Sequence, residues 1–400
     1  MRGGSGVEVL ATPGNAGIAR DGVECLPGGD VVEYARDREI DLVVVGPEAP
    51  LVAGLVDDLS TAGIAAFGPT RAAARIEGSK AYAKELMRDC GVPTASHVMF
   101  RDREEAVTHL ACASYPAVLK ADVLAAGKGV IIAQDEREAR EAVDVFFGEK
   151  RFGDTEVVLE EFLEGEELSL LALCDGEHAV PLAPAQDYKR IFDGDEGPNT
   201  GGMGSYSPVP GIDPDRAREI AAQAHQPIVD ELRRRGTPFH GVLYAGLMMG
   251  ADGEPRVLEY NARFGDPETQ AVLPRLESDL LGLLEASAQP GGLAGVEPGW
   301  SDDWAVTVVL ASRGYPESSS SGDVIRGLDH VEGAEVFHAG TAERDGEIVT
   351  AGGRVLNVTA LGATPGEARD RAYAAAERID FDGKQMRTDI ASRAVDRVGA

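Results

Sequence analysis

Short apolar runs alternate with stretches of helical periodicity near the start of the chain. Asp41–Gly46 is an apolar run that ends in glycine, which is typical of a buried parallel strand, and Ile64–Phe67 is a second such run. Between them, Leu51–Thr61 carries apolar residues at helical spacing, and a long helix is expected over Arg71–Cys90. The pattern therefore predicts an α/β segment over residues 7–76, continued by this helix.

The next part of the chain, residues 94–163, has the pattern of a compact unit. Tyr115–Lys120 reads as a strand that pairs with Val130–Ala133 as a hairpin, across the small-residue loop Ala125–Gly129. Asp135 is placed to cap the helix that follows, because its side chain can accept a bond from a free backbone N–H. Glu156–Leu163 completes the unit as a buried strand.

Beyond this unit, hairpins flank a region without clear periodicity. Two strands are expected within Glu167–Ala185, whereas residues 186–204 contain many small or turn-forming residues. Long ordered loops of this kind are commonly binding loops. A solvent-facing helix is expected over Asp213–Arg235, and a hairpin from Phe239–Met249 to Pro255–Arg263.

The last third of the chain separates from the rest at a linker. Pro267–Ala288 reads as a helix capped by Asp266, and residues 289–298 are rich in glycine and proline. Three strands and one helix follow, so a small α+β domain is expected at the end. We therefore predict three domains, over residues 1–76, 77–290 (with a smaller subdomain at 94–163) and 299–400.

One strand carries an unusual polar face. Side chains alternate along a strand, so Glu259, Asn261 and Arg263 should project from one side of Val257–Arg263. A carboxylate, an amide oxygen and a guanidinium on one face suit a site that handles a metal-bound phosphate. An ordinary solvated strand face remains the alternative for these residues considered alone.

Composition and charge narrow the possible functions. The chain has 400 residues, 43% of them apolar, and no run of ~20 apolar residues or signal peptide is evident, so a cytoplasmic protein is expected. The net charge of -30 argues against binding to nucleic acid or anionic membranes. It resembles the charge of proteins from salt-rich cytoplasm. The cysteines and histidines show no ligand spacing that would indicate disulfides or a zinc site.

Lysines are rare and therefore informative. Only seven of the 38 basic residues are lysine, and two of these, Lys120 and Lys128, converge on the predicted hairpin loop. Gly127 and Gly129 flank Lys128, so backbone and ammonium groups could both approach a polyphosphate.

Three further segments leave two interpretations open. Glu160, Glu161 and Glu167 follow a buried strand, and they could form a nucleotide-binding hinge or a solvated acidic turn. The Gly/Pro-rich loops at 12–17 and 46–50 could hold a small anion or be ordinary turns.

Taken together, the motifs resemble those of the ATP-grasp ligases, and more closely the glycinamide ribonucleotide synthetase (phosphoribosylamine-glycine ligase) family. The motifs that carry the resemblance are Pro13-Gly-Asn-Ala-Gly17, Gly46-Pro-Glu-Ala-Pro-Leu51, Gly78-Ser-Lys-Ala81, Leu124-Ala-Ala-Gly-Lys-Gly-Val130, Gly197-Pro-Asn-Thr-Gly-Gly-Met-Gly204 and Asn261-Ala-Arg-Phe-Gly-Asp-Pro-Glu-Thr-Gln270. The resemblance implies an ATP-grasp fold with an N-terminal Rossmann-like domain that binds phosphoribosylamine and a lid-like subdomain. It also implies ligation of glycine to 5-phosphoribosylamine through a glycyl phosphate, with ATP and Mg²⁺ or Mn²⁺, by a protein expected to be monomeric.

The resemblance also implies roles for individual residues. ATP would be bound by Lys80, Lys120, Lys128, Glu160, Glu161, Phe162, Leu163 and Glu167, and the metal by Glu259 and Asn261. Arg263, Lys128 and Asp187 would be catalytic. The other substrates would contact Asn15, Gly17, Glu48, Pro50, Lys189, Arg190, Asn199, Thr200, Gly201, Gly202, Asp266 and Glu268.

Two departures from the family pattern modify this expectation. Val123 stands where the family usually has glycine. The family also begins with a strand and loop before the region that matches Val7, so we expect a truncated N-terminal domain with an exposed sheet edge. Another ATP-grasp carboxylate-amine ligase, or an ATP-binding protein inactive because of its short N-terminus, remains an alternative.

Overall fold

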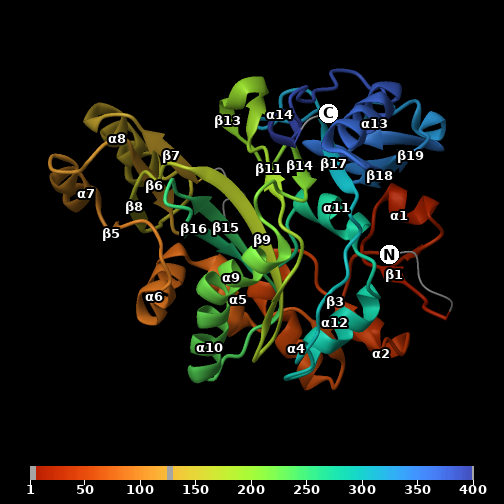
Figure 1. Cartoon of the computed structure of the whole chain (residues 1–400), viewed down its shortest axis with the longest axis horizontal. Coiled ribbons are helices and arrows are strands. Elements are labelled where there is room, and N and C mark those ends of the chain that lie inside the picture. The colour runs from red at the N-terminus through yellow and green to blue at the C-terminus, as the bar shows by residue number, and fades with distance from the viewer. Residues whose placement is uncertain (1–5, 124–128, 399–400) are drawn as a thin grey trace.

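The computed structural model describes residues 6–123 and 129–398, which build three structural regions around a central antiparallel sheet (Figure 1). The N-terminal region contains two parallel strand pairs. Its elements are β1 (Leu10–Ala11), α1 (Ala16–Arg20), β2 (Glu24–Cys25), α2 (Val31–Asp37), β3 (Leu42–Val44), α3 (Glu48–Ala53), α4 (Leu55–Thr61) and β4 (Ala65–Phe67). The predicted α/β segment is confirmed. Its expected helix at 51–61 is divided at Gly54, whose φ of 97° lies in the left-handed region.

The long helix expected over Arg71–Cys90 is instead two helices, α5 (Arg71–Gly78) and α6 (Lys80–Cys90). Ser79 has an extended backbone, and its side chain accepts a hydrogen bond from the Tyr82 N–H. A serine in this role begins a new helix, so α5 does not continue into α6.

The predicted compact unit is a four-stranded sheet with strand order β5-β8-β6-β7, covered by two helices. Its elements are β5 (His97–Phe100), α7 (Arg103–Leu110), β6 (Ala117–Ala121), β7 (Val130–Ala133), α8 (Glu136–Val143) and β8 (Val157–Glu161). The predicted hairpin between β6 and β7 and the Asp135 cap of α8 are both confirmed. In Figure 1 this unit stands at one end of the molecule, away from both termini.

The central sheet has strand order β10-β9-β15-β16, and helices cover both of its faces. Its strands are β9 (Glu166–Asp175), β10 (Ala179–Pro181), β15 (His240–Met249) and β16 (Pro255–Asn261). Alternate residues of β9 separate to the two faces: Leu168 and Leu170 pack on the side of α9 (Pro214–Ala224) and α10 (Gln226–Arg234), whereas Leu171 and Leu173 pack on the side of α12 (Leu280–Ala288). The expected helix at 213–235 is therefore two helices with one buried face, separated at His225.

The region at 186–204 is more regular than its sequence suggested. It forms the short strand β11 (Gln186–Asp187) and a hairpin of β12 (Arg190–Phe192) with β13 (Glu196–Asn199). Two hydrogen bonds join the hairpin turn to the C-terminal part of the chain. The Thr388 N–H donates to Asp193 in the turn (2.7 Å), and the Gly194 N–H in the turn donates to Asp389 (2.9 Å). These contacts come from residues almost 200 positions away, which local periodicity does not reveal.

The C-terminal sheet has strand order β11-β14-β17-β21-β18 and is covered by α13 (Pro365–Arg378). Its strands after β11 are β14 (Gly204–Ser207), β17 (Trp304–Ala311), β18 (Glu335–His338) and β21 (Arg354–Gly362), and β19 (Thr341–Arg344), β20 (Glu347–Thr350) and α14 (Ser392–Val398) lie beside it. The predicted C-terminal strands and helix are confirmed. Two strands from before residue 208 complete this sheet, and the predicted domain boundaries remain a prediction.

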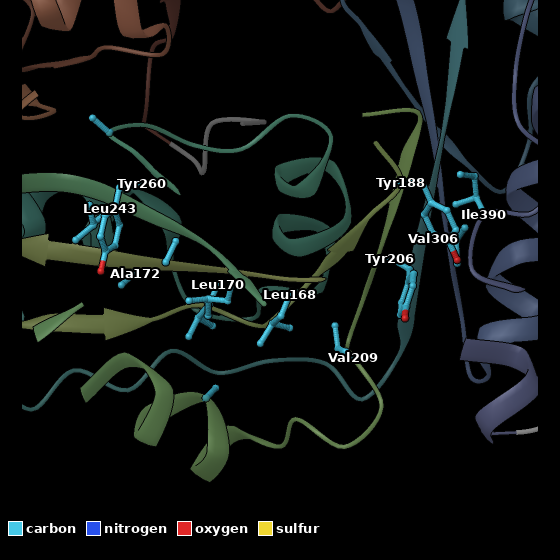
Figure 2. Close-up of a cluster of buried hydrophobic side chains, with 14 of the residues drawn as sticks. Leu168, Leu170, Ala172, Tyr188, Tyr206, Val209, Leu243, Tyr260, Val306 and Ile390 are labelled. Atoms are coloured by element: carbon cyan, nitrogen blue, oxygen red, sulfur yellow. The ribbon is translucent and has the colours of Figure 1, made fainter. Parts of the chain in front are cut away.

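The central and C-terminal regions share one hydrophobic core. Figure 2 shows Leu168 and Leu170 from β9 in the same cluster as Tyr188, Tyr206 and Ile390. The helix expected at 267–288 is broken into α11 (Glu268–Val272), a 3-10 turn and α12. Pro267 precedes α11, and Asp266 does not cap it. No helix within the described residues is long and apolar enough to cross a membrane.

Candidate active site

A cavity of about 580 Å³ opens between the four-stranded unit, the central sheet and the C-terminal sheet. It brings together most of the residues that the sequence singled out. Those that line it are Glu48, Lys80, Lys120, Glu160, Glu161, Phe162, Leu163, Glu167, Asp187, Lys189, Asn199, Thr200, Gly201, Glu259, Asn261, Arg263, Asp266 and Glu268. They come from all three regions of the chain, so the cavity exists only in the folded protein.

A few expected residues lie elsewhere. Asn15 caps α1, and its Nδ2 donates to the carbonyl of His338 (2.8 Å), while Gly17 packs directly against the His338 ring. Pro50, Arg190 and Gly202 also lie outside the cavity lining. Lys128 falls outside the described residues, so its proposed role stays a prediction.

Glu259 lies at the centre of the cavity, on β16. Its neighbour Leu258 is the extra residue of a β-bulge opposite Gly246 and Leu247. The bulge leaves Glu259 and Asn261 on the cavity side, while Val257 and Tyr260 both enter the core on the other side. The expected alternation therefore holds from Glu259 onward and fails at Leu258.

The Glu259 carboxylate makes no hydrogen bond or ion pair with any residue that the structure describes. Burial opposes its ionisation, but the field of Lys189, Lys120, Lys80 and Arg263 lowers its pKa. Glu259 thus favours the ionised form and can donate an oxygen to a metal, with Asn261 two residues further along the same strand. No group of three or more His, Cys, Asp or Glu side chains among the described residues could hold a metal by itself. A site of one carboxylate and one amide suits a hard cation that takes its other ligands from a bound phosphate.

The ammonium groups of two lysines share one buried carboxylate at the inner end of the cavity. Lys120 Nζ and Lys84 Nζ lie 3.0 and 3.1 Å from the same oxygen, Oε2 of Glu160, and the Glu160 side chain is only 2% exposed. Lys84 also donates to Thr94 Oγ1 (2.8 Å), and Lys120 to the Leu258 carbonyl (3.1 Å). Burial lowers the pKa of Lys84 to about 8. The other oxygen of Glu160 is buried without a partner among the described residues.

Apolar side chains surround this inner end. Val118 and Ile132 come from the β6–β7 hairpin, and Leu163 and Met248 come from the central sheet side. An apolar lining of this kind suits a flat heterocycle.

Lys80 begins α6 and lines the same cavity. Its Nζ donates to the Val123 carbonyl (3.0 Å), and burial lowers its pKa. Asp122 accepts from Ser79 Oγ and from the Ala81 N–H, both at 3.1 Å, and so ties the start of α6 to the end of β6. Lys80 and Lys120 both lie close enough to Glu259 for their charges to lower its pKa, and a polyphosphate bound there would need this positive charge.

Arg263 is held by two acidic residues from the N-terminal part of the chain. Its Nη2 lies 3.2 Å from Glu77 Oε1, and its Nε lies 3.4 Å from Glu48 Oε2. The second oxygen of Glu77 accepts from the Ala262 N–H (2.7 Å). Burial raises the pKa of Glu77 to about 7, although the Arg263 charge and the Ala262 amide act against this shift.

The opposite end of the cavity is rich in carboxylates. Lys189 Nζ pairs with Glu167 Oε2 (2.7 Å), and Glu167 and Asp187 raise the pKa of Lys189 although burial opposes it. Burial raises the pKa of Asp187 to about 8 against the charge of Lys189, and it also raises the pKa of Glu268. Tyr244 donates to Glu268 Oε1 at 3.0 Å. Such an end can receive a cationic or amine-bearing molecule.

Sequence reasoning missed four residues at this site: Lys84, Glu77, Tyr244 and Arg354. The scarcity of lysine could have drawn attention to Lys84. Glu77 and Tyr244 sit within ordinary helical and strand patterns, and Arg354 reaches the cavity from the C-terminal sheet, so their sequence context carried no signal.

Three family models match successive parts of the chain. They are described as the N domain (residues 4–77), the ATP-grasp (A) domain (residues 78–269) and the C domain (residues 305–393) of phosphoribosylglycinamide synthetase. Because the N-domain model matches residues 4–77, the expectation of a truncated N-terminal domain is not supported.

Individual relatives agree with these matches. The phosphoribosylamine–glycine ligase of Streptomyces coelicolor is 53% identical over 392 residues, which are 96% of this chain and 92% of the relative. The crystal structure of the phosphoribosylamine–glycine ligase of Thermotoga maritima is 38% identical, covers 96% of this chain and 94% of its own, and has a TM-score of 0.83. A biotin carboxylase domain of Hydrogenobacter thermophilus, solved with MgADP, covers 96% of this chain and 87% of its own at 17% identity with a TM-score of 0.71, which shows likeness of fold alone.

Proposed function

The chain belongs to the phosphoribosylglycinamide synthetase family, and we propose that the cavity described above performs the reaction for which its relatives are named. This reaction is the ATP-dependent ligation of glycine to 5-phosphoribosylamine, giving glycinamide ribonucleotide, ADP and phosphate. It is a step of purine biosynthesis. The single observation that carries the proposal is Glu259, a carboxylate without an ion pair among the described residues, which shares one cavity with Lys80 and Lys120 and with the carboxylates around Lys189.

In the first step, a carboxylate oxygen of glycine forms a bond to the γ-phosphorus of ATP while the bond to ADP breaks, which leaves glycyl phosphate. We propose that Lys80 and Lys120, which line the cavity, neutralise the phosphates, and that Arg263 contacts the transferred group. The adenine base would occupy the apolar part of the cavity beside Glu160 and Leu163. Positioning and charge neutralisation are the main contributions that a protein makes to phosphoryl transfer.

Family members of the ATP-grasp type use ATP with divalent metal ions, and the donor set here fits such an ion. We propose that Glu259 and Asn261 hold Mg²⁺ or Mn²⁺, which would offset the negative charge of the phosphates when bound. The remaining residues bind, orient and shield the reacting groups.

In the second step, the amine nitrogen of phosphoribosylamine forms a bond to the carbonyl carbon of glycyl phosphate, the bond from that carbon to the phosphate oxygen breaks, and the nitrogen loses a proton. We propose that the end formed by Asp187, Lys189, Glu268 and the loop 199–201 frames these groups. The raised pKa of Asp187, about 8, lets this carboxyl group exchange a proton near neutral pH. Glu48, from the N-terminal region, also lines the cavity and lies 3.4 Å from Arg263 Nε. No covalent protein nucleophile is needed, because the acyl phosphate is already activated.

A coupled assay of ADP release with ATP, glycine and phosphoribosylamine tests the proposal. Turnover that requires both substrates is expected. ATP binding without turnover would favour an inactive nucleotide-binding protein, and turnover with another carboxylate or amine in place of glycine or phosphoribosylamine would favour a different ATP-grasp ligase. A cytoplasmic location and a monomeric state remain predictions.

A further inference from the structure

Arg354, at the start of β21, reaches the cavity from the C-terminal sheet, whose strand β11 also contributes Asp187. Its Nη1 donates to the carbonyls of Gly201 (2.6 Å) and Asp266 (2.7 Å), and its Nη2 lies 3.1 Å from Asp266 Oδ2. One guanidinium therefore joins the loop 199–202 to the segment that begins α11. A lysine could not make the same set of bonds, because its single ammonium lacks the planar fork.

Tyr315 holds the same loop from a second direction. The Gly201 N–H donates to the Tyr315 hydroxyl (3.0 Å), so the C-terminal region binds both the N–H and the carbonyl of Gly201. The fit is tight: a Cβ at position 201 would lie 2.9 Å from Arg354 Cζ, and one at Gly202 would lie 2.4 Å from Pro267 Cδ. Gly202 also has a φ of 108°, which favours glycine.

Thr200, in the same loop, connects the Arg354 contact to the carboxylate-rich end of the cavity. Thr200 is buried, and its N–H and hydroxyl both donate to the Lys189 carbonyl, at 2.7 and 2.8 Å. The Gly202 N–H donates back to Thr200 Oγ1 (2.9 Å). Arg354 fixes the loop at Gly201, and Thr200 connects this loop to the backbone at Lys189. Asp187 lies two residues before Lys189 on the same segment.

The nucleotide end has separate supports. Lys80 is fixed by the Val123 carbonyl, and Lys120 by Glu160 and the Leu258 carbonyl. None of these groups belongs to the C-terminal sheet. Lys189 links the two ends through its ion pair with Glu167 (2.7 Å), so a change at Arg354 should affect the end at Lys189 and Asp187 more than the nucleotide end.

We propose that Arg354, assisted by Tyr315, is a positioning residue for the end of the site that receives glycine and phosphoribosylamine. It sets the loop 199–202, and through Thr200 it sets the side chains of Lys189 and Asp187, without taking part in ATP binding. The inference rests on the proposed function for its substrates, and it assigns to the C-terminal region a specific part in that reaction.

Steady-state kinetics of Arg354→Gln and Arg354→Lys test the proposal. In Arg354→Gln, we expect KM for glycine or phosphoribosylamine to rise by about tenfold or more and kcat to fall, while KM for ATP changes less than about twofold. Arg354→Lys should recover part of the loss, because an ammonium can still reach the carbonyls. Arg313→Gln is the matched control: Arg313 lies in the same region, in an exposed ion pair with Asp382 (2.6 Å), and should leave all constants unchanged. An equal rise in all three KM values, or no rise in any, would overturn the proposal.

Hydrogen exchange of the peptide covering residues 196–204, measured without substrates, gives a second readout that does not depend on turnover. Exchange should be faster in Arg354→Gln than in the wild type or in Arg313→Gln. Unchanged exchange would contradict the proposal that Arg354 fixes the loop 199–202. If Arg354→Gln does not fold, Tyr315→Phe replaces it. This variant removes the hydroxyl that accepts from the Gly201 N–H, and it should raise KM for glycine or phosphoribosylamine by about two- to fivefold. Unchanged KM values would overturn the proposal. A wild-type protein without turnover would refute the proposed function. The exchange result would still show whether Arg354 fixes the loop 199–202.

Discussion

The substitution Glu77→Gln separates the stability of this protein from its activity. Glu77 lies near the end of α5 with a side chain that is 6% exposed, and its carboxylate contacts both Arg263 Nη2 (3.2 Å) and the Ala262 N–H (2.7 Å). Glutamine has nearly the same size and keeps an oxygen acceptor for the Ala262 N–H. It removes only the negative charge beside Arg263.

The expected change in stability follows from the pKa of Glu77. Burial raises this pKa from the ordinary 4.5 to about 7 in the folded protein. Because the folded value is the higher one, the contribution of Glu77 to stability is fully present below about pH 4.5 and is lost as the pH rises through about 7. Each unit of pKa difference corresponds to about 1.4 kcal/mol, so the free energy of unfolding of the wild type should fall by about 3 kcal/mol between about pH 4.5 and pH 7. Glu77→Gln should remove this pH dependence.

The activity should change in the opposite direction. Without the charge of Glu77, Arg263 keeps one ion-pair partner among the described residues, Glu48 at 3.4 Å, and its guanidinium would be held less firmly in its proposed position at the transferred phosphoryl group. Loss of a supporting partner of this kind typically costs about 10- to 100-fold. We therefore expect kcat at pH 8 to fall by a factor in this range while the variant gains stability relative to the wild type at the same pH.

Denaturant unfolding at pH 5 and pH 8, together with ADP-release kinetics at pH 8, provides the measurement. Glu33→Gln on the exposed surface of α2 is a suitable control, because it removes a charge that does not line the cavity. If the variant and the wild type lose stability in parallel between pH 5 and pH 8, Glu77 is not the buried group described here. Wild-type kcat in the variant would refute the role given to the contact with Arg263.

Three other predictions concern the site and the surface. Glu259→Gln should reduce kcat by two or more orders of magnitude with an unchanged thermal midpoint, because it weakens a metal ligand without leaving a cavity. Near wild-type turnover would refute the role of Glu259 as a metal ligand. Lys84→Met should raise KM for ATP by about tenfold and leave KM for glycine nearly unchanged, since Lys84 supports Glu160 at the nucleotide end only; a rise for glycine alone would contradict this. The net charge of -30 predicts activity that increases with salt, measured as turnover from dilute buffer toward molar KCl, and a maximum in dilute buffer would argue against salt adaptation.

Much of the site was predictable because its residues lie in short contiguous motifs. The strand face of Glu259, Asn261 and Arg263 follows from the alternation of side chains, which is a local property of the backbone. The hairpin that carries Lys120 and the cap at Asp135 are local for the same reason. Each of these features depends on residues only a few positions apart, so periodicity and capping preferences are sufficient to predict them.

Helix breaks and the structure of the loop region were not predictable in this way. The sequence around Ser79 permits a continuous helix, and the chain breaks there because Ser79 and Ala81 are bound by Asp122, which is more than 40 residues away. The hairpin at 190–199 is similarly held by residues 388 and 389. In both places a distant partner supplies the hydrogen bonds that decide the local conformation.

The sequence by itself determined the types of elements, the family motifs and the polar face of β16, because these depend on local spacing. Only the tertiary structure decided that Lys84 and Lys120 share Glu160, that Glu77 holds Arg263, and that Arg354 reaches the loop at Gly201 from a strand some 150 residues later. These contacts arise where sheets and helices pack together, and the free energy of burying charged groups in pairs depends on every surrounding element. A single strand or helix pattern contains no record of those neighbours.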